Sequence, residues 1–431
     1  MKKLTNLQYA IVNLLGIALG MDKKSYEERL KYAEKNNWKA QISEMEICDN
    51  NGESTIEQIE IIEAINMYNE VKNGCTSKKM WIDMSCSGAT IHELLTRTIS
   101  KKTSIVGKSL RKKKILDLYT DLFNTYKLKC MEEGVSPTID GIAEITRKLL
   151  KEGIIPWFYN GEATMKKLVG KKGLEIFRKI YAQALPGSEG FRQATLNGWN
   201  SKAYSYQWNG PDGAQIEFCV QSDPKLMQAY IDTKCELNYM LTENEPREMW
   251  LEDKNGELYR NTGVKCLGAN LTHSIDRYCL FEVVRMVHMT KGRALEILAK
   301  SAMSEKSWEE SEQLVRLYEC YKKQNIVSVR WLYLIEENMC KLPEDVHSEL
   351  MKITENELGS KEFDIMVIHD AYGCTVNHMN RLRRTANFVL ASLYKSTIID
   401  YWNEQLGLNI PISEYKEEVY EQILEADYLM A

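Results

Sequence analysis

Apolar side chains recur every three or four positions across residues 55–73, which is the period of an amphipathic helix. Ser54 and Glu57 have the spacing of a capping box, and Gly74 is suited to ending the helix. A second stretch, residues 289–358, has the same spacing and is rich in Glu, Lys, Leu and Met. The pattern therefore predicts a helix in the first stretch and a mostly helical block in the second.

Two short apolar runs lead to an acid, one directly and one through a histidine. Met80–Asp83 is followed by the small-residue turn Ser85–Gly88 and then by a further helical segment. Phe363–Ile368 has the composition of a buried strand and runs directly into His369-Asp370. The pattern predicts two strands, with Asp83 at the end of one and Asp370 just beyond the other.

A hairpin is predicted around Asn255-Gly256, because an Asn-Gly pair between strand-like residues is a strong hairpin signal. On its own, this signal is met by a plain surface hairpin.

The composition is that of a soluble globular protein with more than one domain: 431 residues, 44% hydrophobic and 27% charged. The chain has a net charge of −5, whereas nucleic-acid-binding proteins are commonly basic overall. Contact with DNA would therefore need local basic patches. Two stretches are basic enough to form such patches, residues 101–114 and 381–384. Either stretch could equally well be the solvated face of a helix.

Cysteine usage indicates a reducing cytoplasm, because the 11 cysteines are scattered and none forms a CxxC pair. Residues 10–19 have a weak likeness to a secretion signal. Asn13 interrupts this apolar run, which is too short to cross a bilayer, and its helical period suits a core helix. We expect no membrane association.

Acids at strand ends are held rigidly, so two neighbouring ones can bind a pair of Mg²⁺ ions for phosphoryl transfer. Asp83 and Asp370 have this placement, although a single Asp at such a position is more often a cap or turn residue. Between them, Arg147 and Lys151 are spaced to share one helix face, where they could bind a triphosphate. Tyr159 lies two turns further on, and Gly153 and Pro156 are expected to disturb the helix.

Taken together, these residues resemble the phage-type, single-subunit DNA-directed RNA polymerases. Asp83-Met84-Ser85-Cys86-Ser87-Gly88 resembles the family's motif A, Asp-Gly-Ser-Cys-Ser-Gly. The Arg147, Lys151 and Tyr159-Asn160-Gly161 spacing is similar to motif B, and Ile368-His369-Asp370-Ala371-Tyr372-Gly373 to motif C. Weaker matches follow the family's order along nearly the whole chain: Gly20-Met21-Asp22 with Glu28-Arg29-Leu30-Lys31, Trp208 with Pro211-Asp212-Gly213, Asn270 to Ser274, and Glu425 to Ala431.

The resemblance implies a role for each matched residue. Asp83 and Asp370 would hold two Mg²⁺ ions, with the Met84 backbone carbonyl as a further ligand. Arg147 and Lys151 would bind the incoming ribonucleoside triphosphate. Tyr159 would help to select ribose over deoxyribose, with His273 as its neighbour and hydrogen-bond partner, and His369 would support the position of Asp370.

The implied fold is a helix-rich α+β right-hand polymerase with a small antiparallel palm sheet. Residues 1–100 would form the first part of the palm, 101–272 the fingers and 273–431 the second part of the palm. Residues 289–358 would be a helical insertion in that second part, and residues 245–266 would correspond to the family's promoter-reading hairpin in the fingers.

This sequence departs from the family pattern at several positions. Met84 and Asn160 replace glycines, and Ile275 stands where a polar residue is common. Val12 falls near a position where the family has a lysine. The family's N-terminal region has no counterpart here, so we expect a second polypeptide to supply it, beside the DNA template and RNA transcript as partners.

Two alternatives stay open. A family A DNA polymerase shares the palm and the Arg, Lys and Tyr helix, but its motif A carries a glutamate that excludes the ribose 2′-hydroxyl, and Met84 to Ser87 contain none. The second alternative is a DNA-binding scaffold that has the polymerase fold but no catalytic activity. It has no physical need for two neighbouring, mutually repelling acids.

Overall fold

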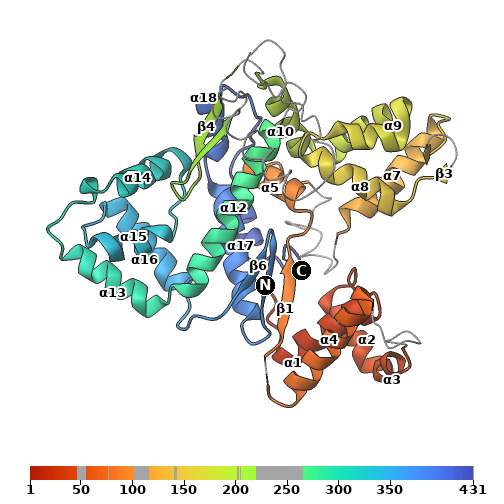
Figure 1. The fold of residues 1–431 in the computed structure, drawn as a ribbon, viewed down its shortest axis with the longest axis horizontal. Helices are drawn as coiled ribbons and strands as arrows, with labels where there is room; N and C mark the ends of the chain where they lie inside the picture. Colours follow the sequence, from red (N-terminus) through yellow and green to blue (C-terminus); the bar gives the residue numbers. More distant parts are fainter. Residues whose placement is uncertain are drawn as a thin grey trace, which may run out of the picture.

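The computed structural model describes residues 1–45, 55–75, 77–100, 116–139, 143–200, 203, 205–219 and 266–430. It is a helix-rich α+β structure with small antiparallel sheets, as the sequence predicts. Figure 1 shows a small central sheet with three helical groups around it: α1–α4 in red and orange, α7–α9 in yellow, and α13–α16 in teal and blue. Two sequence predictions lie outside the described residues: the basic stretch at 101–114, and the hairpin at 245–266 except for its last residue, 266.

The central sheet has the strand order β1-β7-β6 and is antiparallel throughout. Its strands are β1 (Lys79–Asp83), β6 (Met366–Ile368) and β7 (Ala371–Thr375). The sequence placed a buried strand at 363–368, and this was wrong in two respects. Only 366–368 form a strand, and Ile368 is 58% exposed, because β6 is the edge of the sheet rather than its centre.

Two long helices carry the main hydrophobic core beside this sheet. In α12 (Leu267–His288) and α17 (Met379–Lys395), buried side chains recur at helical spacing and pack together with Tyr372 and Cys374 of β7. Gly373, between these two strand residues, allows a close contact, since a Cβ there would lie 2.9 Å from the Trp81 ring on β1.

The first helical group is α1 (Asn6–Ala18), α2 (Tyr26–Lys35), α3 (Trp38–Ser43) and α4 (Ile56–Lys72). The apolar run at 10–19 belongs to α1 and is largely buried in the core, and no helix among the described residues is long and apolar enough to cross a membrane. The helix predicted at 55–73 is α4. Its capping box is formed by Thr55 and Gln58 rather than by Ser54 and Glu57, because the cap lies one residue further along.

The second group consists of α7 (Leu118–Glu132), α8 (Arg147–Phe158) and α9 (Glu162–Ala184), with the short strands β2 (Thr138–Ile139) and β3 (Ala143–Glu144). In the sequence it lies between α5 (Ser87–Thr96) and α10 (Pro186–Asn197). Contrary to expectation, α8 continues through Gly153 and Pro156. Gly153 is the close-packing point against α9, because a Cβ there would lie 2.9 Å from Met165.

The block at 289–358 is mostly helical, as predicted. It consists of α13 (Lys291–Ala302), a 3₁₀ turn (Trp308–Glu310), α14 (Glu312–Gln324), α15 (Arg330–Asn338) and α16 (Glu344–Asn356). Fully buried Asp212, in the hairpin of β4 (Ser205–Asn209) and β5 (Gln215–Cys219), fixes this block to the core. Its carboxylate accepts from Arg277 and Arg285 of α12, and its carbonyl accepts from Arg330 of α15.

The two ends of the described chain meet beside the sheet (Figure 1). After α17 come α18 (Ile398–Leu406), α19 (Glu417–Leu424) and a final segment that pairs with the residues following β1. Arg383 joins these parts, because its guanidinium donates to the Lys2 and Asp427 carbonyls at 3.2 and 2.6 Å and to the Tyr9 hydroxyl at 2.9 Å. The basic stretch at 381–384 is therefore neither a DNA patch nor a solvated face: Arg383 is 1% exposed, and Arg384 pairs with Glu357.

An Arg383→Met variant is expected to lower the free energy of unfolding by about 3 kcal/mol, because the buried Tyr9 hydroxyl and the partly buried Lys2 and Asp427 carbonyls lose their donor. Denaturant titration measures this loss. Arg316→Met is the matched control: among the described residues this arginine pairs with the exposed Glu312 alone, so its loss should change the free energy of unfolding by less than about 1 kcal/mol. Equal effects of the two substitutions would contradict the buried anchoring role.

Candidate functional site

Asp83 and Asp370 lie at the same end of the central sheet. Asp83 is the last residue of β1 and pairs in register with Ala371, the first residue of β7. Asp370 immediately precedes Ala371, and its carbonyl accepts a hydrogen bond from the Met84 backbone N–H at 3.3 Å. The antiparallel register thus brings together two acids that are far apart in the sequence.

The turn that carries Asp370 is the two-residue loop His369-Asp370 between β6 and β7, closed by the Ile368–Ala371 pair. Such tight hairpin loops need positive φ at the first central position, and His369 adopts a φ of 55° there. A residue other than glycine in this conformation stores strain of about 1–3 kcal/mol. His369 therefore sets the backbone of the turn that carries Asp370.

Asp83 is exposed at the end of β1 and Asp370 is half-buried, and the cleft that both line also carries Lys23, Arg147 and Lys151. Burial and the nearby Asp370 charge raise the pKa of Asp83 to about 6, while Met84, Lys151 and Lys23 act in the opposite direction. Lys23 was not singled out from the sequence, although it lines the same cleft. Two carboxylates that repel one another in a cleft favour the binding of cations.

The turn after β1 is held by the final segment of the described chain. Met84 is buried in the core and forms a β-bridge with Met430, and the Ser85 backbone N–H donates to the Leu429 carbonyl at 3.1 Å. Met84 thus fills space in the core where the family pattern has glycine. Cys86 then takes a φ of 51°, which turns the chain into α5.

Helix α8 faces these acids across one cleft of about 1070 Å³. The cleft brings together most of the side chains predicted from the sequence: Asp83, Met84, Arg147, Lys151, Tyr159 and Asp370. Helix α5 packs closely against α8, because a Cβ on Gly88 would lie 3.0 Å from that of Phe158. His273 and His369 do not line this cleft.

Arg147 and Lys151 of α8 have partners at the start of α7 that the sequence did not reveal. Arg147 donates to the Thr120 hydroxyl and to the Asp117 carboxylate, each at 2.7 Å. The Lys151 ammonium lies 5.1 Å from the centre of the Tyr119 ring. Burial acts to raise the pKa of Asp117, but hydrogen bonds from Thr120 and Arg147 outweigh burial and hold it below its usual range.

Tyr159 follows α8 and lies beside His273 of α12, with ring centroids 5.0 Å apart. The two residues are neighbours, as predicted, but the hydroxyl of Tyr159 is hydrogen-bonded to Ser87 and not to His273. Burial raises the pKa of Tyr159 to about 12, so the hydroxyl stays neutral at physiological pH. Asn160 takes a φ of 67°, a conformation that asparagine tolerates better than most residues, which accounts for its replacing glycine.

A third acid, Asp276, lies close enough to Asp370 to feel its charge, and the sequence analysis did not identify it. It lies three residues after His273 on α12, so the helical spacing was the available signal. Burial and the charge of Asp370 raise the pKa of Asp276 to about 7, and its Oδ1 atom makes no hydrogen bond with any described residue. Ionised Asp276 is therefore destabilising in the absence of a cation.

An Asp276→Asn variant is expected to gain thermal stability relative to the wild type as the pH rises from 5 to 8. Because the pKa of Asp276 is raised in the folded protein, protonated Asp276 adds to the free energy of unfolding, and this contribution is fully present below about pH 4. It is lost as the pH rises through about 7, at up to about 1.4 kcal/mol per pH unit. Asparagine has no such loss. Melting temperatures in metal-free buffer check this, with exposed Asp364→Asn as the control; a difference from wild type that is independent of pH would contradict it.

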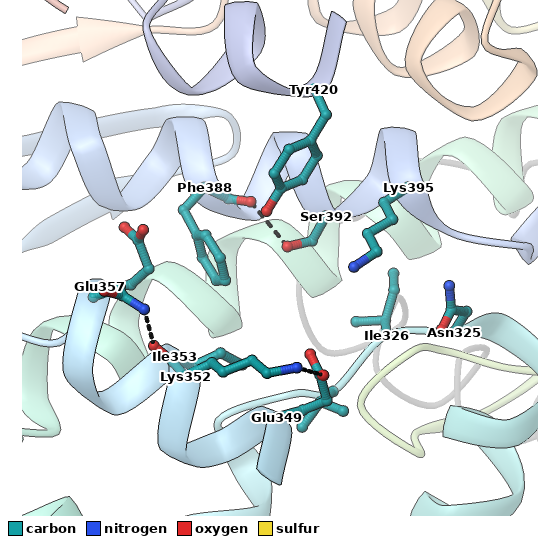
Figure 2. Close-up of a pocket in the computed structure, with 12 residues that line it drawn as sticks. Asn325, Ile326, Glu349, Lys352, Ile353, Glu357, Phe388, Ser392, Lys395 and Tyr420 are labelled. Atoms are coloured by element: carbon teal, nitrogen blue, oxygen red, sulfur yellow. Dashed lines mark hydrogen bonds and ion pairs between the residues drawn. The ribbon is translucent and has the colours of Figure 1, made fainter. Parts of the chain in front are cut away.

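A smaller pocket lies on another part of the molecule, between α16, α17 and α19, and shares no residue with the cleft. Figure 2 shows Lys352 against Glu349 and Ser392 bonded to the Phe388 carbonyl in its wall. The two acids that line this pocket are both ion-paired, Glu349 with Lys352 and Glu357 with Arg384, unlike the repelling acids of the cleft.

Comparison with known proteins adds no assignment, because neither models of known families nor the sequences of curated proteins matched this chain.

Proposed function

We propose that this chain is the catalytic subunit of a DNA-directed RNA polymerase of the phage-type, single-subunit class. It would transfer ribonucleotides from their triphosphates to the 3′ end of an RNA during transcription of phage genes in the bacterial cytoplasm. The observation that carries the proposal is the register of β1 and β7. It sets Asp83 and Asp370 side by side, in one cleft with Arg147 and Lys151.

The available donors are suited to Mg²⁺. Asp83, Asp370 and the Met84 carbonyl offer only hard oxygen ligands, and the mutual repulsion of the acids is relieved by a cation. Substrate phosphates and water would complete the coordination, because Mg²⁺ usually keeps waters that phosphate oxygens can replace. Two bound Mg²⁺ ions would supply charge stabilisation at the attacking and leaving oxygens.

The protein's own residues would then orient the substrate. Arg147 and Lys151 would bind the triphosphate and neutralise charge that develops on the departing pyrophosphate as the 3′-hydroxyl forms its bond to the α-phosphorus. The neutral Tyr159 hydroxyl, fixed by Ser87, would hydrogen-bond the ribose, and His273 would hold the ring in place. The partners would be a DNA template, the RNA transcript and a second polypeptide.

A Mg²⁺ titration monitored by melting temperature tests the enzyme against the inactive scaffold. Mg²⁺ should raise the melting temperature of the wild type, because it binds the folded acid pair and not the unfolded chain. The rise should disappear in Asp83→Asn and Asp370→Asn and persist in Asp364→Asn, whose side chain is exposed and outside the cleft. A melting temperature that is insensitive to Mg²⁺ in the wild type would favour the scaffold.

A further inference from the structure

We propose that the first turn of α7, residues 117–120, is the element that positions the triphosphate-binding cations of α8. Asp117 and Thr120 act as positioning residues for Arg147, and Tyr119 does so for Lys151. The inference rests on the proposed function, since it concerns the same cleft. The family resemblance assigned no residue of α7 to the site.

The guanidinium of Arg147 is fixed on one side only. Nε donates to the Thr120 hydroxyl and Nη2 to the Asp117 carboxylate, each at 2.7 Å. Nη1 makes no hydrogen bond with any described residue, and Arg147 lines the cleft. Because the guanidinium is planar and rigid, two fixed nitrogens determine where the third one points.

Asp117 is itself held in a single orientation. It is the N-cap of α7: its Oδ1 accepts from the Thr120 backbone N–H at 3.1 Å and its Oδ2 from the Thr120 hydroxyl at 2.7 Å. Capping fixes the carboxylate before Arg147 binds to it. The position of Arg147 is therefore set by the backbone of α7 rather than by a flexible surface partner.

Tyr119 of the same turn connects the other cation to the acids. Its ring lies 5.1 Å from the Lys151 ammonium, and its hydroxyl is hydrogen-bonded to Cys86 in the turn after Asp83. One turn of α7 thus contacts Arg147, Lys151 and the turn next to the acid pair. An unrestrained arginine or lysine loses side-chain entropy when it is immobilised, and this arrangement removes part of that cost in advance.

Binding of inorganic tripolyphosphate to the full chain, measured by calorimetry, tests the proposal without requiring activity. Thr120→Val and Asp117→Asn should each weaken binding by about tenfold, because each removes or neutralises one partner of Arg147. Thr125→Val, which changes an exposed threonine on the same helix, is the matched control and should bind as the wild type does. In nucleotide addition the two variants should raise KM for all four nucleotides with little change in kcat.

A double-mutant cycle with Arg147→Ala separates positioning from a general structural effect. If Thr120 and Asp117 act through Arg147, their substitutions should have no additional effect on binding in the Arg147→Ala background. Effects that persist in that background would overturn the proposal. A second outcome separates the positioning role from the proposed function. If Thr120→Val and Asp117→Asn bind tripolyphosphate as tightly as the wild type or more tightly, while Arg147→Ala binds it weakly, the positioning role of α7 is overturned and the proposed function still stands. If Arg147→Ala itself binds normally, the assignment of Arg147 fails, and the proposal fails with it.

Discussion

An Asp370→Asn variant is expected to lose nucleotide addition by about a thousandfold or more while remaining folded. The carboxylate stands beside Asp83 in a cleft where charge is stabilised electrostatically, and loss of one such group commonly costs two to three orders of magnitude in rate. Asparagine keeps the size of the side chain and the turn. It also removes the repulsion that raises the pKa of Asp83, so metal-free stability at pH 8 should not fall.

The rate of extension of an RNA primer in single-turnover conditions measures this effect, and melting temperature reports folding. Asp364→Asn provides a control with the same chemical change, because Asp364 is an exposed acid just before β6 and does not line the cleft. Comparable activity of Asp370→Asn and Asp364→Asn would remove Asp370 from the catalytic centre.

Replacing Tyr159 with phenylalanine is expected to retain nucleotide addition but to reduce the preference for ribonucleotides by at least about tenfold. The ring contact with His273, with centroids 5.0 Å apart, needs no hydroxyl, so the shape of the site is kept. What disappears is the neutral hydroxyl fixed by Ser87, the group available to hydrogen-bond the ribose. The ratio of kcat/KM for a ribonucleotide and its deoxyribonucleotide is the measurement.

Tyr119→Phe is the comparison for this second effect. Tyr119 lines the same cleft, and its hydroxyl is directed to Cys86, so its loss should leave the sugar preference unchanged. If Tyr159→Phe keeps full discrimination, or if both variants lose it equally, the hydroxyl of Tyr159 has no specific role in sugar selection.

The sequence was informative where the determining signal is local. Each acid follows a short apolar run, and Arg147 and Lys151 are one helical turn apart, so strand, helix and candidate side chains could be recognised without knowing the fold. That Asp83 and Asp370 are neighbours follows from the pairing of β1 with β7, which no local pattern encodes.

Other features depend on long-range packing and could not be predicted. The exposure of β6 follows from its place at the sheet edge, and the burial of Arg383 follows from the meeting of the two chain ends. Asp117 pairs with Arg147 across 30 residues of sequence, so its role in the cleft is visible only in three dimensions. A basic cluster in sequence is equally compatible with a surface patch and a buried anchor until its partners are known.

The most direct test of the central claim is the extension of an RNA primer on a DNA template by the purified chain, with Mg²⁺ and either ribonucleotides or deoxyribonucleotides. The account predicts extension with ribonucleotides that is abolished by Asp370→Asn. Preference for deoxyribonucleotides would contradict it in favour of a DNA polymerase, and ribonucleotide extension that survives Asp370→Asn would contradict the assignment of the acid pair as the catalytic centre.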